Sequence, residues 1–405
     1  MTATHLQKEL EQSAKISIIN FVNCLLEDAY QMRASDIHID PEDEKIQIRF
    51  RIDGVLHDIH AFEPAIYQEV LSRIKILARL RTDEHQAAQD GRFRYLIKES
   101  GRPIDIRVSI VPTFYDENVV MRLLVDQAED FDLGSLGFSE ENRKKVLRAA
   151  KRPHGMILAT GPTGSGKTTT LYTLIKFLNH RNTSIITIED PVEYSIKGIN
   201  QIQANPRAGL TFANGLRSIL RQDPNIIMVG EIRDAETAGI AVNTALTGHL
   251  LLSTLHTNDA ATTLPRLLDM GIESYLIAST VNVAIGQRLV RKICDHCKKE
   301  KVITPAERKS LADVLPKDFL ENQKNFFEGK GCDKCAKSGY KGRIGVHEVL
   351  VVDGPIRDAI LRKASADEIR KIAVEHGMTP IFEDAVQKAK DGITTLEEVL
   401  RILHE

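Results

Sequence analysis

The sequence predicts an α/β protein built around a parallel β-sheet. Four short apolar segments, at 155–160, 184–190, 225–231 and 250–257, alternate with stretches of helical periodicity. Strands that alternate with helices form parallel sheets whose two faces are both covered. Polar residues gather at the carboxyl ends of these segments, which is where open α/β sheets bind their ligands. We therefore expect a ligand site at that edge.

The composition is that of a soluble globular protein of several domains. The chain has 405 residues, of which 42% are hydrophobic and 27% charged. A net charge of -2 argues against a general nucleic-acid binder, which would carry a basic surface. The N-terminus has no apolar signal core, and no window approaches the roughly 20 apolar residues that span a bilayer. We expect a cytoplasmic protein whose contact with a membrane, if any, is peripheral.

A smaller α+β domain is expected to precede the parallel sheet. Residues 15–35 and 65–80 have helical periodicity, and alternating segments around them predict strands, with a turn at Asp53 and Gly54. Ser139 is expected to cap a helix that runs to about 151. The predicted divisions are an N-terminal domain at 1–125, a linker at 126–138, a core at 139–290, a cysteine module at 291–345 and a C-terminal helical region at 346–405.

Residues 161–168, GPTGSGKT, match the phosphate-binding pattern G-x-x-x-x-G-K-[ST] between an expected strand and an expected helix. The glycines let backbone N–H groups turn inward toward phosphate oxygens, and the helix N-terminus adds partial positive charge. Lys167 is expected to reach the β- and γ-phosphates, and the Thr168 hydroxyl to bind Mg²⁺. The predicted residues for binding ATP are Gly161, Pro162, Thr163, Gly164, Ser165, Gly166, Lys167, Thr168 and Thr169.

Acidic residues and histidines follow or flank the neighbouring strands. Hydrolysis needs one carboxylate to activate water and another to hold Mg²⁺ or its waters. We assign Glu231 to the metal, and the spacing leaves Glu189, Glu193 and Glu231 as alternatives for the base. His249 and His256 flank the apolar segment at 250–255, and we expect both to lie near the γ-phosphate.

Four of the five cysteines occur in two C-x₂-C pairs, Cys294 with Cys297 and Cys332 with Cys335. Four thiolates close a structural Zn²⁺ site, whereas two independent redox pairs or free thiols are the less favoured alternative. The pairs are farther apart than the about 15–20 residues of short zinc ribbons, so the insert should form its own lobe, with a helix at 305–321. His296 and His347 are candidate substitute ligands.

Several segments together resemble the ATPases of bacterial type II secretion and type IV pilus assembly over about residues 15–405: GPTGSGKTTTLY, TIEDPVEY, LRSILRQDPNIIMVGEIRD, TGHLLLSTLHTNDA and GQRLVRKICDHC. The resemblance implies a RecA-like P-loop NTPase core, preceded by a PAS-like domain and followed by the zinc module and C-terminal helices. It implies Glu193 as the catalytic base, Glu231 at the metal and a role for both histidines. It also implicates four arginines in activity: Arg107, Arg122, Arg217 and Arg221.

The resemblance further implies a ring hexamer that acts on an inner-membrane platform protein at the cytoplasmic face of the membrane. In that family the four-cysteine module marks assembly ATPases and is absent from retraction ATPases, which favours pilus or pseudopilus extension. Many members carry a further N-terminal docking domain, and this sequence begins almost at the second domain, as a short member or a truncated chain. Two alternatives are a related ATPase that moves DNA and a zinc-ribbon nucleic-acid binding module with a regulatory nucleotide. The basic segment 288–301 supports the second, although no specific nucleic acid is expected.

Overall fold

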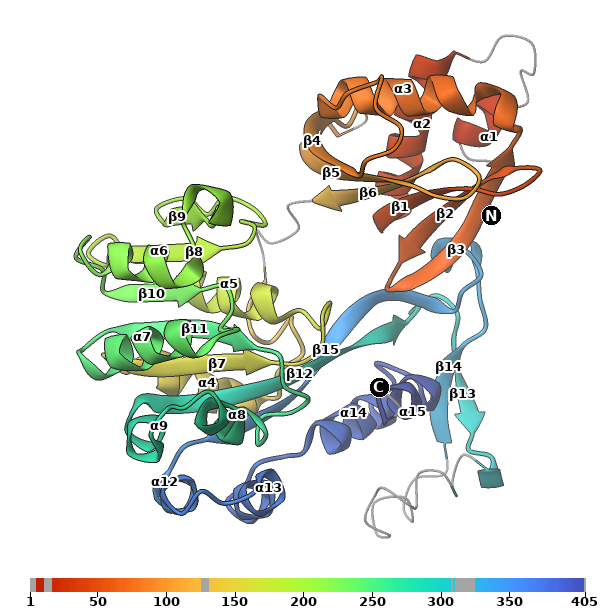
Figure 1. Ribbon diagram of the computed structural model, residues 1–405. Helices are drawn as coiled ribbons and strands as arrows, with labels where there is room; N and C mark the ends of the chain where they lie inside the picture. The colour runs from red at the N-terminus through yellow and green to blue at the C-terminus, as the bar shows by residue number, and fades with distance from the viewer. Residues whose placement is uncertain are drawn as a thin grey trace. The chain divides into compact units, whose positions relative to one another are not determined.

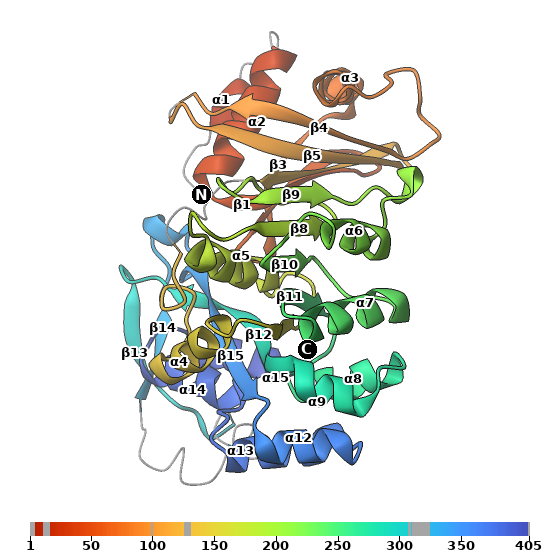
Figure 2. The ribbon, with the colours of Figure 1, turned by 90° about the vertical axis from the view of Figure 1, so that its left-hand side faces the viewer.

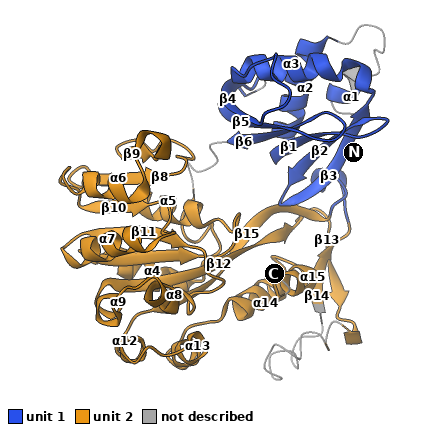
Figure 3. Ribbon diagram, in the orientation of Figure 1, with its two compact units in different colours: residues 1–127, 331–338 blue, residues 128–330, 339–405 orange. Residues whose placement is uncertain are grey.

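The structure is a computed structural model that describes residues 5–10, 17–98, 100–124, 131–306, 309 and 325–403 (Figure 1). These residues divide into two compact units, shown in Figure 3. Unit 1 comprises residues 1–127 and 331–338, and unit 2 comprises residues 128–330 and 339–405. No described helix has the length and apolar character needed to cross a lipid bilayer.

Unit 1 is built on a six-stranded antiparallel sheet in the order β3-β2-β1-β6-β5-β4. Its helices α2 and α3 contribute apolar residues to one core with this sheet. Asp53 and Gly54, both at positive φ, form the expected turn between β2 and β3. The α+β organisation predicted for this region is confirmed. Its elements are α1 (His5–Leu10), α2 (Ile18–Gln31), β1 (Ala34–Pro41), β2 (Ile46–Ile52), β3 (Val55–Phe62), η1 (Pro64–Ile66), α3 (Tyr67–Ala78), β4 (Gln89–Leu96), β5 (Pro103–Pro112) and β6 (Glu117–Leu124).

Unit 2 is built on a seven-stranded sheet in the order β15-β12-β7-β11-β10-β8-β9. All neighbours are parallel except β12 and β15. The four predicted strands are present as β7, β8, β10 and β11, which lie next to one another in the sheet (Figure 1). Figure 2 shows β8, β10 and β11 of this sheet from another side. The strands are β7 (Gly155–Thr160), β8 (Ile185–Glu189), β9 (Asn200–Gln203), β10 (Ile226–Val229), β11 (Leu250–Leu255), β12 (Val281–Ile293) and β15 (Tyr340–Val351).

Two hydrophobic cores explain why these central strands are apolar along their whole length. One core joins the sheet to residues of α6, α7, α8, α9, α12 and α13, and the other joins it to residues of α4 and α5. Because both faces are covered, every residue of β7, β10 and β11 is buried. The helices are α4 (Glu140–Ala150), α5 (Lys167–Leu178), η2 (Pro206–Ala208), α6 (Phe212–Ile219), α7 (Ala235–Leu246), α8 (Thr263–Asp269) and α9 (Ser274–Thr280).

Ser139 caps α4 as predicted, because its hydroxyl oxygen accepts a hydrogen bond from the Asn142 N–H at 3.2 Å. The long strands β12 and β15 were not predicted, and they cross the expected boundaries at 290 and at 345. The helix expected at 305–321 lies almost entirely outside the described residues. The remaining elements are β13 (Lys298–Val302), β14 (Asn325–Gly329), η3 (Asp333–Cys335), α12 (Gly354–Leu361), α13 (Ala366–Glu375), α14 (Ile381–Lys390) and α15 (Leu396–Leu403).

Candidate nucleotide and metal sites

The predicted phosphate loop connects the end of β7 to the start of α5. Gly161, Gly164 and Gly166 have φ values of 142°, 79° and 87°, a region that other residues rarely adopt. Space is also restricted at two of them. A Cβ atom at Gly161 would lie 2.3 Å from the backbone oxygen of Gln287, and one at Gly166 would lie 2.8 Å from the Gln287 Nε2. The glycines of the motif are therefore required both by backbone conformation and by close packing.

Lys167 folds back over the loop that it follows. Its Nζ donates hydrogen bonds to the backbone oxygens of Gly161 at 2.7 Å and Pro162 at 2.9 Å, and the side chain is only 8% exposed. Burial lowers the pKa of Lys167, while attraction to Glu231 opposes this shift. The hydroxyl of Ser165 is buried and has no hydrogen-bond partner among the described residues. A buried ammonium and an unsatisfied hydroxyl in a loop with three glycines at positive φ fit the binding of a phosphate group.

Gln287 on β12 is a structural partner of the loop that the sequence did not reveal. Its Nε2 donates to the backbone oxygen of Ser165 at 2.8 Å, and its Oε1 accepts from the Thr170 hydroxyl at 2.7 Å. One side chain thus joins the loop to the first turn of α5. Gln287 is part of the quoted segment GQRLVRK, but no pattern in the sequence pointed to this contact.

Glu189, one alternative for the catalytic base, is a buried structural residue. Its carboxylate is 2% exposed and accepts hydrogen bonds from the Tyr172 hydroxyl and from the Thr187 hydroxyl at 2.5 Å. Gln201 Nε2 donates to it at 3.3 Å. Burial raises the pKa of Glu189 despite these donors. A carboxylate whose oxygens are already engaged is poorly placed to take a proton from water.

Glu193 lies four residues farther on, in the loop after β8, and is half-buried. Its backbone N–H donates to the Tyr172 hydroxyl at 3.4 Å, so the same tyrosine contacts both glutamates. The two glutamates of the segment TIEDPVEY therefore differ in environment. Of this pair, only Glu193 stays a candidate for the base.

Glu231 and His256 lie together at the carboxyl edge of the sheet. The parallel register pairs Val229 with Ser253, so β10 and β11 end side by side. Glu231 Oε2 lies 3.1 Å from His256 Nε2, and Glu231 Oε1 lies 2.6 Å from Arg233 Nη2. The Glu231 side chain is 11% exposed and attracts Lys167 electrostatically. A nearly buried carboxylate thus contacts a histidine and interacts electrostatically with the lysine of the phosphate loop.

His249 lies at the other end of β11. Its backbone oxygen accepts a hydrogen bond from Gly155 N, at the start of β7, and its Nδ1 lies 3.2 Å from the backbone oxygen of Thr244. The phosphate loop follows Thr160, at the opposite end of β7. Within one chain His249 therefore lies at the opposite end of these strands from the phosphate loop, and a role for it at the nucleotide stays a prediction. A residue that precedes a parallel strand lies at the amino edge of the sheet.

The four implicated arginines lie in two places. Arg107 and Arg122 pair directly across β5 and β6 in unit 1, and Arg122 Nε lies 2.8 Å from Asp36 Oδ1. Arg217 lies on α6 and Arg221 just after it in unit 2, where Arg217 Nη2 lies 2.7 Å from Glu236 Oε1 and Arg221 Nη1 donates to the Arg217 backbone oxygen. The approach of any of them to a nucleotide stays a prediction.

The four cysteines of the two C-x₂-C pairs form one cluster. Their Sγ atoms all lie within 4.8 Å of one another, and those of Cys332 and Cys335 are 3.7 Å apart. Tetrahedral Zn²⁺ with Zn–S bonds of about 2.3 Å places sulfurs about 3.8 Å apart. No disulfide joins the cysteines, all five of which are described. Cys332 N also donates to Cys335 Sγ at 3.2 Å. The donor set therefore fits a four-thiolate metal ion.

Neither candidate substitute ligand belongs to this cluster. His296 is exposed, and His347 is completely buried with its ring stacked on Phe138 at a centroid distance of 3.6 Å. Both ring nitrogens of His347 have no hydrogen-bond partner among the described residues. Burial lowers the pKa of His347 far below its usual range. The suggestion that His347 could replace a cysteine is wrong.

Comparison with known proteins identifies the family. The family model described as Type II/IV secretion system protein matches residues 11–401. The chain is 46% identical over 393 residues to type II secretion system protein E of Xanthomonas campestris pv. campestris, covering 97% of this chain and 68% of that protein. It is 46% identical to type II secretion system ATPase E of Vibrio cholerae, covering 98% and 77%. It is 45% identical to the type IV pilus assembly ATPase PilB of Thermus thermophilus, covering 97% and 43%.

Solved structures show the same fold. The ATPase DotB of Legionella pneumophila superposes with a TM-score of 0.71 at 23% identity, covering 96% of this chain and 97% of that one. The pilus retraction motor PilT, solved with bound ADP, superposes with a TM-score of 0.63 at 25% identity, covering 94% and 96%. The resemblance found in the sequence is confirmed. The chain belongs to the family of type II/IV secretion system proteins, which includes ATPases of type II secretion and of type IV pilus assembly.

Proposed function

We propose that this chain hydrolyses ATP at the edge of unit 2 and that the reaction drives assembly of a type IV pilus or a type II secretion pseudopilus. The observation that supports this best is the convergence of Lys167 and the Glu231–His256 pair at the carboxyl edge that carries the phosphate loop. Relatives named as ATPases of both systems, at 45–46% identity, support the cellular role.

Each residue at this edge has a proposed task. Backbone N–H groups of residues 163–168 and the Lys167 ammonium bind the phosphates, because fixed positive charge interacts strongly with a phosphate in a buried setting. Thr168 and Glu231 would hold Mg²⁺ or its waters, and the ion would neutralise charge on the phosphates. His256 lies 3.1 Å from Glu231, and we propose that it orients this carboxylate and senses the terminal phosphate.

Glu193 is proposed as the base that accepts a proton from the attacking water. Glu189 is excluded by its engaged, buried carboxylate, and Glu231 is already paired with Arg233 and His256. Glu193 is half-buried in the adjoining loop, where a carboxylate keeps access to water. General-base catalysis of this kind contributes roughly 10²- to 10⁴-fold in rate.

The wider assembly is also a proposal. Arg107, Arg122, Arg217 and Arg221 would supply positive charge to the transferring phosphoryl group, which in a ring hexamer can come from another unit or another chain. The motor would act on a platform protein at the cytoplasmic face of the inner membrane. The cysteine cluster would hold Zn²⁺ as a structural ion and favours the assembly role over retraction.

The direct test is Glu193→Gln in the full chain. Phosphate release should fall at least about 10²-fold because the amide cannot accept the proton, while ATP affinity stays within about two-fold. Phosphate release is measured by a coupled assay, and affinity by calorimetry with a non-hydrolysable analogue. Glu273→Gln, an exposed carboxylate before α9, is the matched control and should leave both unchanged.

Near-normal turnover in Glu193→Gln would remove Glu193 as the base. Addition of the platform protein with acidic lipid should stimulate the wild-type chain. Stimulation by DNA instead would favour the DNA-moving alternative and contradict the assembly role.

A further inference from the structure

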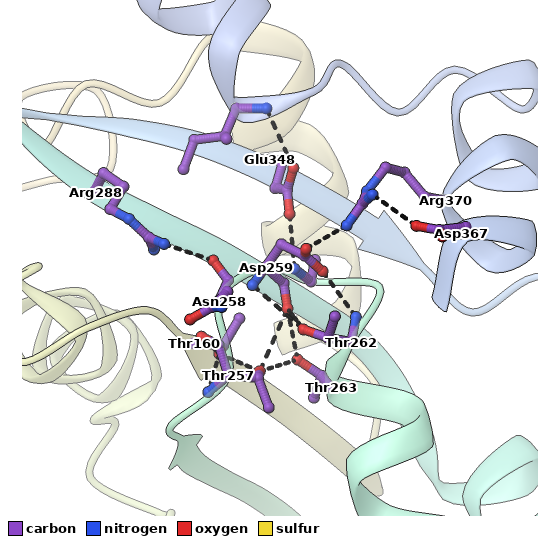
Figure 4. A network of polar contacts seen from close by, with 12 residues as sticks. Thr160, Thr257, Asn258, Asp259, Thr262, Thr263, Arg288, Glu348, Asp367 and Arg370 are labelled. Carbon is purple, nitrogen blue, oxygen red and sulfur yellow. Dashed lines mark hydrogen bonds and ion pairs between the residues drawn. The ribbon is translucent and has the colours of Figure 1, made fainter. Parts of the chain in front are cut away.

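The loop after β11, residues 256–260, connects the carboxyl edge of the sheet, where we propose ATP hydrolysis, to the C-terminal helices (Figure 4). Each of its five residues contacts a different part of unit 2. The contacts are His256 to Glu231, Thr257 to Thr160, the Asn258 backbone oxygen to Arg288, Asp259 to Arg370, and the Ala260 N–H to Glu348. We call residues 256–260 the junction loop. A segment held at every residue moves as one piece.

On the nucleotide side, the junction loop is attached to the strand that carries the phosphate loop. The Thr160 hydroxyl, at the end of β7, donates to the Thr257 backbone oxygen at 2.7 Å and accepts from the Thr257 N–H at 3.1 Å. Arg288 Nη2 donates to the Asn258 backbone oxygen at 2.8 Å. Because these bonds involve backbone atoms, a shift of the loop must alter the geometry around Thr160 and His256.

On the C-terminal side, Arg370 of α13 forms an ion pair with Asp259. Arg370 Nη2 bonds Asp259 Oδ2, and its Nη1 bonds Asp367 Oδ1 at 3.1 Å. Asp259 uses its other oxygen locally, because Oδ1 accepts from the Thr262 N–H at 2.8 Å. One carboxylate therefore fixes the turn that leads into α8 and also reaches a helix 111 positions later in the chain.

Glu348 of β15 makes a second, more permanent attachment. It is 3% exposed, and its two oxygens accept from the N–H of Ala260 at 2.7 Å and of Ile381 at 3.2 Å. A Cβ atom at Gly286 would lie 2.7 Å from the Glu348 Cγ, so the carboxylate passes β12 only because a glycine stands there. Glu348 is thus fixed, whereas the Asp259 and Arg370 side chains are 18% and 40% exposed and can separate.

From this difference we propose that Arg370 is a positioning residue for ATP hydrolysis, which holds the junction loop through Asp259 and so keeps His256 on Glu231. The inference rests on the proposed ATPase function. Displacement of α13 would break the exposed ion pair first, and the loop would pivot on the buried Glu348 contact. His256 would then lose its position relative to Glu231. The position of the C-terminal helices would thereby change the rate of ATP hydrolysis, although these helices do not contact the nucleotide.

The test compares full-chain variants in the phosphate-release assay. Arg370→Ala should lower kcat roughly ten-fold, since a displacement of about 1 Å can reduce a rate by up to 10²-fold, and should change KM less than two-fold. Asp259→Asn should match it, because an amide oxygen still accepts from Thr262 N while the ion pair is lost. Arg370→Lys should recover part of the rate. The double variant should be no worse than either single variant, as expected of residues that act through one contact.

Two matched control variants test whether any substitution in or near α13 lowers kcat, even when the contact between Asp259 and Arg370 is kept. Asp367→Asn removes the negative charge of the other partner of Arg370 and leaves the Asp259 contact, and Arg362→Ala breaks the nearby exposed pair with Glu368. Both should retain the wild-type kcat, and all variants should melt within a few degrees of the wild type.

Several results would overturn the proposal. They are an unchanged kcat in Arg370→Ala and Asp259→Asn, an equal loss in Asp367→Asn, additive losses in the double variant, or a loss that follows melting temperature across all variants. If the wild-type chain hydrolyses ATP and Arg370→Ala has the same kcat, only this inference is contradicted. If the wild-type chain does not hydrolyse ATP, even with the platform protein and lipid, both the proposed function and this inference are contradicted.

Discussion

The nucleotide edge and the cysteine cluster are held in place by different forces. At the nucleotide edge, the positions of Lys167, Glu231 and His256 follow from the ends of buried parallel strands. At the cysteine cluster, four sulfurs converge within 4.8 Å on segments that pack little apolar surface of their own. Phe326 and Ile303, buried apolar residues between the two cysteine pairs in the sequence, belong instead to a small core shared with α14 and α15.

The difference indicates which site depends on its ligand. Hydrophobic burial of about 25 cal/mol per Å² keeps the sheet and its loop in place whether or not phosphate is bound. Four converging thiolates repel one another and need a cation, and metal binding in such sites supplies local folding free energy. We therefore expect removal of a ligand group at the nucleotide edge to abolish chemistry, and removal of a cysteine to abolish local structure.

The largest expected effect is that of Lys167→Ala. Phosphate release should fall roughly 10²- to 10³-fold, because a preorganised cation at the phosphates is lost. The melting temperature should stay the same or rise, since burial lowers the pKa of this ammonium and so disfavours its charged form. Lys144→Ala, an exposed lysine on α4, is the control. Loss of activity through unfolding of Lys167→Ala would contradict the view that this edge is held by the sheet alone.

A local structural effect is expected at the cysteine cluster. Elemental analysis should find one Zn per chain, and Cys335→Ser should remove it. Amide hydrogen exchange should then accelerate in β13, β14 and the residues between Cys332 and Tyr340, but not in β7 or β11, because only the first group depends on the metal. Cys24→Ser, in α2 of unit 1, is the control. Retention of protection around Cys335→Ser would show that packing alone maintains this region.

Local patterns predicted the strands, the phosphate loop and the cysteine pairs because each is encoded within a few residues. Gly161 and Gly166 are needed at one turn, and the apolar segments are continuous because both faces of the sheet are covered. The place of His249 also follows from local order, since a residue before a parallel strand lies at the opposite edge of the sheet from residues after it.

Other features could not be predicted, because they join distant parts of the chain. Nothing near Asp259 marks Arg370 as its partner, and nothing near Ser165 marks Gln287. The strands β12 and β15 pair with each other over most of their length. Both contain charged residues, so neither is a continuous apolar segment of the kind that predicts a buried strand. Contacts between distant residues are set by topology, which periodicity alone does not give.

The smallest expected effect is on the stability of unit 2 at acid pH, and it arises outside both the nucleotide edge and the cysteine cluster. His347 is buried in unit 2 with a pKa far below 6.5, chiefly through burial and secondarily through Lys388, while its backbone N–H donates to Asp384. In the unfolded chain it takes up a proton near pH 6.5, so folding stability is present above that pH and is lost as the pH falls toward the folded pKa.

The loss is at most about 1.4 kcal/mol per pH unit below 6.5. His347→Phe should therefore show a shallower decline of melting temperature between pH 7.5 and 5.5 than the wild type, whatever its stability at pH 7.5. His180→Phe, at an exposed site, should keep the wild-type slope. Both variants should be measured in chains that also carry Cys335→Ser. Release of metal from the cysteines at low pH then cannot contribute to the slope of melting temperature against pH. An unchanged slope in His347→Phe would mean that the acid sensitivity of unit 2 arises elsewhere than at this stacked, unprotonated ring.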